Sequence, residues 1–128
     1  MKLHKKNKRR FLYTALFAML ILFLTITPTD ISEKAPNLFF KGVDKLIHAM
    51  MYGLFSMLSL YEYFKQKPLS YIPYILILFG VLLYSVLMEI IQHYLVAYRS
   101  GELNDVLANF SGILIGALFI LWFKKVKS

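Results

Sequence analysis

The stretch YIPYILILFGVLLYSVLMEIIQHYLV, residues 71–96, decides the fold of this chain. It is apolar over most of its length, and a single carboxylate, Glu89, interrupts it. A helix rises about 1.5 Å per residue, so about 20 residues cover the roughly 30 Å hydrocarbon core of a bilayer. We therefore predict a membrane-spanning helix, because an isolated strand would leave its backbone groups without partners in lipid.

Three further apolar segments lie at residues 11–27, 46–64 and 103–123. Together the four segments predict an all-α fold, a bundle of four transmembrane helices in one domain covering residues 1–128. Short turns between the second, third and fourth segments predict antiparallel neighbours. The chain is 59% hydrophobic, above the roughly 45–50% of soluble domains. No small-residue cleavage site follows the first segment, so we expect an uncleaved helix rather than a signal peptide.

The basic residues predict the orientation of the bundle. With the N-terminus inside, eleven of the fifteen basic residues flank the inner ends, and the other four are Lys34, Lys41, Lys45 and Arg99. The positive-inside rule then predicts that the N- and C-termini are both cytoplasmic. The same clustering beside apolar runs explains the net charge of +8 without nucleic acid, which we do not expect as a partner.

Polar residues gather where the outer ends of three helices are expected to meet. On the second helix they recur at i, i+4 spacing and therefore share one face. The candidate binding residues are Asp44, Lys45, Tyr52, Gln92, Arg99, Asp105 and Asn109, and the candidate catalytic residues are Glu89 and His48.

The helical rise predicts two levels in this cluster, if the helices are straight and untilted. His48, Gln92 and Asn109 are expected nearer the surface, and Tyr52 and Glu89 deeper. A charge near the membrane centre costs about 2.5–3.5 kcal/mol on insertion scales. Glu89 is therefore expected to face the bundle, where it either stays ionised beside a partner or acts as a general acid or base.

Several of these positions also have a purely structural interpretation. Asp105 suits the N-terminus of a helix. Lys45 and Arg99 can extend their charged ends to the membrane interface. His93 can face lipid, so it is not included in the site. Gly112 and Gly116 form a GxxxG step, which is expected to let two helices approach closely.

The stretches DKLIHAMMYGLFSML (44–58) and MEIIQHYLVAYRSGELNDVLANFSGILIG (88–116) resemble the VanZ-like family of bacterial membrane proteins. The shared pattern falls on Asp44, Lys45, His48, Tyr52, Glu89, Gln92, Arg99, Ser100, Asp105, Asn109 and Gly112. The resemblance covers residues from about 28 to 116. It implies a multi-pass protein of the bacterial cytoplasmic membrane with a role in the cell envelope. The family is named for a protein that lowers susceptibility to the glycopeptide antibiotic teicoplanin.

Two functions follow from an outer polar pocket. In the first, the pocket binds or acts on an amphiphilic or lipid-linked envelope molecule, with a teicoplanin resistance-type role. In the second, the protein is an intramembrane hydrolase or transferase that acts on a lipid-linked envelope precursor. Glu89 would then be the base and His48 its proton partner, while Arg99 and Lys45 would hold an anionic head group.

Two other functions use the same residues differently. His48 and His93 could ligate haem or a metal from neighbouring helices, although we expect no metal and no cofactor. The chain has no cysteine, which excludes thiolate metal sites and disulfides. Alternatively, the polar cluster only locks the helices of a structural subunit together. The sequence leaves the oligomeric state open.

Overall fold

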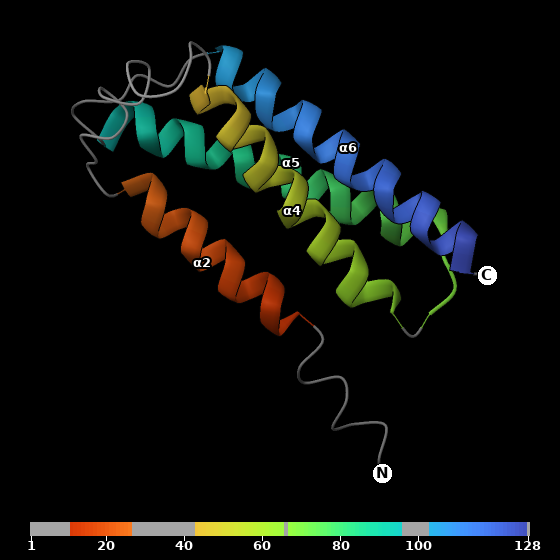
Figure 1. The fold of residues 1–128 in the computed structure, drawn as a ribbon. Coiled ribbons are helices and arrows are strands. Elements are labelled where there is room, and N and C mark those ends of the chain that lie inside the picture. The colour runs from red at the N-terminus through yellow and green to blue at the C-terminus, as the bar shows by residue number, and fades with distance from the viewer. Residues whose placement is uncertain (1–10, 27–42, 66, 96–102, 128) are drawn as a thin grey trace.

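A computed structural model describes residues 11–26, 43–65, 67–95 and 103–127 (Figure 1). Within these ranges every regular element is a helix: α2 (Leu12–Ile26), α4 (Val43–Phe64), α5 (Tyr71–Leu95) and α6 (Leu103–Lys127). The all-α prediction is therefore confirmed. Two boundaries differ from the expected ones by three residues or more, since α4 begins at Val43 rather than residue 46 and α6 continues to Lys127 rather than ending at residue 123.

Helices α4 and α6 form the most extensive helix pair of the molecule. Small residues allow it, since a Cβ atom added at Gly112 would overlap the backbone carbonyl of Ala49. One added at Gly53 would lie 3.0 Å from the carbonyl oxygen of Gly112, and one added at Gly116 would overlap Ser56. The GxxxG step therefore lies at a helix crossing where the two backbones touch, as the sequence predicts.

Helices α2 and α5 complete the bundle around α4. Helix α5 lies behind α4 and α6 in Figure 1, and α2 lies on the other side of α4. Phe17 of α2 stacks on Phe55 of α4 with ring centroids 5.9 Å apart, and the Tyr84 hydroxyl of α5 donates to the carbonyl oxygen of Ala18. The core that joins all four helices consists of Ile21, Tyr52, Phe55, Val81, Met88 and Ile113.

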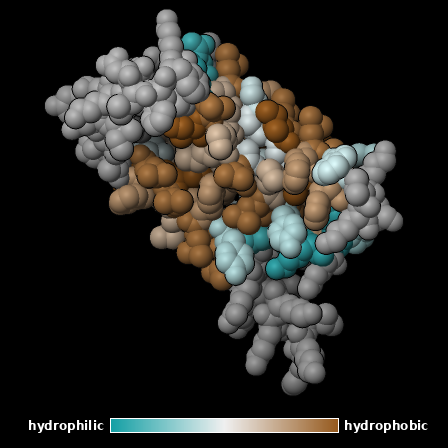
Figure 2. Space-filling view, viewed as in Figure 1, coloured by the Kyte–Doolittle hydropathy of each residue, from teal (hydrophilic) through white to brown (hydrophobic). Residues whose placement is uncertain are grey.

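The outside of the bundle carries many large apolar side chains. Helices α5 and α6 are each long and apolar enough to cross a membrane, whereas α2 is apolar but has only 15 residues. Large side chains along α5, among them Ile72, Leu76 and Phe79, are more than half exposed. Figure 2 shows apolar residues over the middle of the visible face and hydrophilic ones toward its ends. A soluble monomer rarely exposes so continuous an apolar surface.

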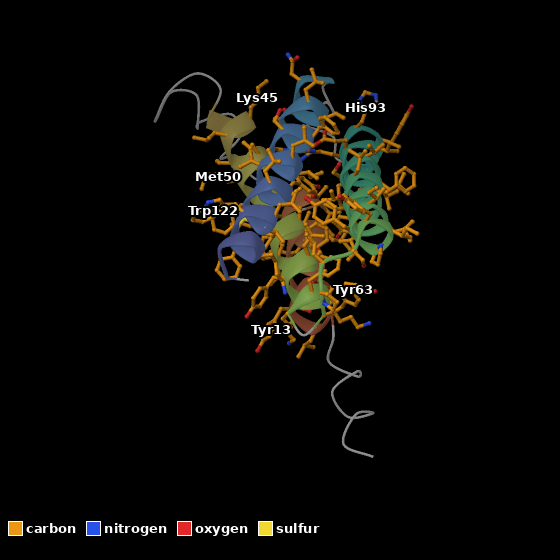
Figure 3. The ribbon with its side chains drawn as sticks, turned by 90° about the vertical axis from the view of Figure 1, so that its right-hand side faces the viewer. Tyr13, Lys45, Met50, Tyr63, His93 and Trp122 are labelled. Atoms are coloured by element: carbon orange, nitrogen blue, oxygen red, sulfur yellow. The ribbon has the colours of Figure 1, made fainter. Side chains whose placement is uncertain are left out.

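The two ends of the bundle carry different groups. At one end, named here the Lys124 end, the amino group of Lys124 donates to the carbonyl oxygens of Phe64 and Lys67, and so caps the C-terminus of α4. At the opposite end, named here the His48 end, α4 and α6 begin and α5 finishes. Figure 3 shows Tyr13 and Tyr63 toward the first end and Lys45 toward the second.

Candidate functional site

Three helices each contribute one polar side chain to a closed set of contacts at the His48 end. Nδ1 of His48 on α4 lies 3.2 Å from Oδ1 of Asn109 on α6 and 3.4 Å from Oε1 of Glu89 on α5. Nδ2 of Asn109 donates to the same Glu89 oxygen at 3.3 Å. Because Nδ1 faces two oxygen acceptors, this ring nitrogen carries the proton and donates it. We call His48, Glu89 and Asn109 the three-helix cluster.

The three-helix cluster is shielded from solvent. Asn109 is completely buried, and Glu89 is only 6% exposed. Tyr52 is buried one helical turn after His48, and Gln92 is buried one turn after Glu89. The second carboxylate oxygen of Glu89, Oε2, has no hydrogen-bond partner among the described residues. The cluster therefore presents a buried acceptor oxygen to which another group can donate.

A charged pair lies at the same end of α4 and α6. The amino group of Lys45 is 3.9 Å from Oδ1 of Asp105, and the lysine side chain is 35% exposed. Asp105 occupies the first turn of α6, where the positive end of the helix dipole favours a carboxylate. The helix dipole and the lysine therefore act on the same carboxylate, which fits the structural role of Asp105, and its role in binding stays a prediction.

The structure brings most of the predicted site together. His48, Glu89 and Asn109 are in contact, Lys45 pairs with Asp105, and both groups lie at the end of the bundle that the sequence predicts. Of the remaining candidates, Tyr52 and Gln92 are buried. Arg99 lies outside the described residues, as does the side chain of Asp44.

The prediction of two separate levels is wrong for Glu89. Its carboxylate touches both His48 and Asn109, so all three belong to one level. The level estimate counted residues from the helix ends and treated the helices as straight and untilted. Helix α5 instead crosses behind α4 and α6 at an angle (Figure 1), so equal residue counts do not correspond to equal depths.

His93 is placed apart from the three-helix cluster. Its side chain is exposed, and its ring packs edge-on against Tyr94 at a centroid distance of 4.8 Å. Figure 3 shows His93 at the same end as Lys45 but on the other side of the bundle. Within the described ranges no three histidine, cysteine or acidic side chains are grouped to hold a metal ion.

One buried acid was missed as a site residue by sequence reasoning, which placed Glu62 merely near the inner side. Glu62 is 2% exposed at the Lys124 end, and its Oε1 accepts a hydrogen bond of 3.0 Å from the backbone N–H of Thr14. A carboxylate on α4 thereby caps the N-terminus of α2. The sequence does contain a pattern that places Glu62 on the polar face of α4. Polar residues recur there every three or four positions, at His48, Tyr52, Ser56, Ser59 and Glu62.

The serines on this face of α4 are satisfied by the backbone. The Ser56 hydroxyl donates to the carbonyl oxygen of Gly53 at 2.9 Å, and that of Ser59 donates to Phe55 at 2.7 Å. Such bonds are typical of serine inside a helix. Neither hydroxyl is hydrogen-bonded to a histidine, so neither Ser56 nor Ser59 is set up as a nucleophile with an adjacent base.

The chain is similar to known proteins at the level of a family. A family model described as VanZ/LLP1 matches residues 2–124. The match includes the first helix, which the sequence resemblance covered only by its apolar character. No curated protein and no solved structure matches the chain.

Proposed function

Because the chain belongs to the VanZ/LLP1 family, we propose that its three-helix cluster binds an amphiphilic molecule of the bacterial cell envelope. Family membership and two long apolar helices indicate that the protein is associated with a membrane. The observation that carries the proposal is the contact of His48, Glu89 and Asn109, which joins three helices around a buried carboxylate.

We further propose that all four helices cross the cytoplasmic membrane with both termini inside. The described lysines at the Lys124 end, Lys65, Lys67 and Lys124, support this orientation through the positive-inside rule. The His48 end then faces outward, where envelope precursors and antibiotics are encountered. The apolar surface in Figure 2 supports contact with acyl chains.

The energetic balance favours binding over a purely structural role. Interhelical hydrogen bonds in membranes contribute about 0.6 kcal/mol on average. An acidic side chain at membrane depth costs about 2.5–3.5 kcal/mol on insertion scales. Holding Glu89 in the bundle therefore costs more than its hydrogen bonds return, and a ligand that donates to it would supply part of the difference.

The family name supports a resistance-type role. Teicoplanin carries an acyl chain, so it is an amphiphile of the kind that an outer polar site between apolar helices can hold. We propose that the protein lowers susceptibility to teicoplanin by binding the antibiotic or an envelope molecule that the antibiotic targets.

Alanine substitutions test this function directly. Glu89→Ala, Gln92→Ala, Asp105→Ala and Asn109→Ala should each return teicoplanin susceptibility to the level of cells without the protein, while the amount in the membrane stays normal. Ser111→Ala is the matched control on α6, because Ser111 is exposed and its hydroxyl donates only to the carbonyl oxygen of Leu107. Full protection by all four site variants would refute the proposal.

A second candidate is an intramembrane hydrolase or transferase on a lipid-linked envelope precursor. It is favoured by Oε2 of Glu89, which has no partner among the described residues and is therefore free to accept a proton from a bound water or hydroxyl. Turnover of a labelled lipid-linked precursor by the purified protein, lost in Glu89→Gln, would support catalysis. Binding without turnover would leave the first function as the correct one.

A further inference from the structure

We infer that the group entering the three-helix cluster is an uncharged hydroxyl of an amphiphile's head group, and that Oε2 of Glu89 accepts its hydrogen bond. The inference rests on the proposed function, because it names the chemistry of the molecule that the same cluster binds. It follows from the way hydrogen bonds are divided between the two oxygens of one carboxylate.

The two oxygens of Glu89 differ in their partners. Oε1 receives both donors of the cluster, Asn109 Nδ2 at 3.3 Å and His48 Nδ1 at 3.4 Å. Both donors are therefore directed at the same oxygen. Oε2 is as inaccessible to solvent as its neighbours and has no partner among the described residues. Since buried polar atoms are nearly always hydrogen-bonded, this oxygen calls for a donor that the described residues do not supply.

The charges around the cluster select an uncharged donor. An anionic head group would approach two carboxylates, Glu89 and Asp105, and the nearby cation, Lys45, already lies 3.9 Å from Asp105. A cationic head group would be attracted by the carboxylates, but it would have to give up its hydration at a buried site, a cost that an ion pair often does not repay. An uncharged hydroxyl avoids both the repulsion of an anion and this desolvation cost, and it still donates to Oε2.

The surroundings of the cluster suit the rest of an amphiphile. Ile47 directly precedes His48 on α4, Ile90 directly follows Glu89 on α5, and Leu107 lies two residues before Asn109 on α6. All three are about half exposed. Each of the three helices therefore carries an apolar side chain on the outside of the bundle within two positions of its cluster residue, and acyl chains can lie on this outer surface.

The Glu89→Gln variant distinguishes a hydroxyl bound at Oε2 from a purely structural requirement for the three-helix cluster. Glutamine keeps one oxygen, which can accept from His48 and Asn109 as Oε1 does, so the contacts between the helices are retained. At the position of Oε2 it places an NH₂ group, which donates and does not accept. A hydroxyl can still accept from this NH₂ group but loses the charged acceptor for its own proton, so the variant should bind a hydroxyl more weakly, and a phosphate oxygen more tightly, than wild type does.

Native mass spectrometry of the full chain provides the test. The protein is delipidated in lauryldimethylamine oxide, a detergent without hydroxyl groups, and offered dioleoyl lipids that differ only in their polar group. The probes are a glucosyl-diacylglycerol, dioleoylglycerol, dioleoyl phosphatidate and a dioleoyl trimethylammonium lipid. Tyr94→Phe, at an exposed position on the same end of α5, is the control.

Wild-type protein and the Tyr94→Phe control should retain the two hydroxyl lipids about tenfold more tightly than the anionic and cationic ones. About tenfold is the lower end of what a hydrogen bond to a charged group contributes. A further preference for the glucosyl lipid would assign the hydroxyl to a sugar, and equal retention would assign it to any acylglycerol hydroxyl. Glu89→Gln should lose the tenfold preference and retain phosphatidate more tightly than wild type does.

Different results would overturn the inference alone and the proposed function. Wild-type protein that retains phosphatidate or the cationic lipid more tightly than the hydroxyl lipids would overturn the inference and leave binding at the cluster intact. An unchanged hydroxyl preference in Glu89→Gln would also overturn it. Retention of no lipid by any form of the protein would overturn the proposed function and the inference together.

Discussion

The imidazole Nδ1 of His48 lies 3.2 Å from the side-chain oxygen of Asn109, 61 positions later in the chain. The contact ties the start of α4 to the first half of α6, and it orients the amide of Asn109 so that its NH₂ group donates to Glu89. One hydrogen bond between two helices therefore fixes the position of a carboxylate on a third.

The coupling of these two residues is measurable by a double-mutant cycle. We expect His48→Ala and Asn109→Ala each to lower the free energy of unfolding by about 1–2 kcal/mol, with a coupling energy of about 0.6 kcal/mol. Unfolding in mixed micelles, followed by circular dichroism, gives these values. The pair His93→Ala and Asn109→Ala is the control and should be additive, because His93 is exposed. A coupling of zero for His48 and Asn109 would contradict the contact.

The glycines of the bundle are expected to differ sharply in their tolerance of alanine. At Gly112 an added Cβ overlaps the carbonyl oxygen of Ala49, so Gly112→Ala should separate α4 from α6 and destabilise the protein by about 1–3 kcal/mol. Gly80 is the matched control on α5, since nothing lies within 4 Å of a Cβ added there. Gly80→Ala should be neutral or stabilising by up to about 1 kcal/mol, because alanine favours helix. Equal melting temperatures for the two variants would contradict the crossing geometry.

Glu62 should control how α2 is held on the bundle. Glu62→Ala removes the acceptor for the backbone N–H of Thr14, whereas Glu62→Gln keeps an oxygen there. Because the chain has no cysteine, spin labels can be introduced at chosen sites, for example at exposed Met19 on α2 and Leu54 on α4. The distance distribution between them should broaden in Glu62→Ala and stay near that of wild type in Glu62→Gln. Broadening to the same degree in both variants would show that the cap is not what holds α2.

The proposed orientation predicts which positions can be labelled from outside the cell. A cysteine at Thr29 should react with a membrane-impermeant maleimide in intact cells, and a cysteine at Ser128 should react only after lysis. The absence of native cysteine makes each labelling unambiguous. Labelling at position 128 in intact cells would reverse the orientation and place the His48 end in the cytoplasm.

The sequence predicted the helices and the end at which the polar residues gather. Long apolar segments separated by short polar turns predict helices at nearly the observed boundaries, because hydropathy and periodicity are local properties. The pattern around Asp44, Glu89 and Asp105 was sufficient to suggest the family, and the family match covers residues 2–124. Spacing of three and four residues also predicted that His48 and Tyr52 share one face of α4.

Only the tertiary structure decided which polar groups touch. Glu89 meets His48 and Asn109 rather than lying below them, and Glu62 caps a helix that begins 50 residues earlier in the chain. The physical reason is that these contacts depend on how the helices cross. The crossing of α4 and α6 is set by the backbone contact at Gly112, and helical periodicity within one segment carries no information about its angle to the next.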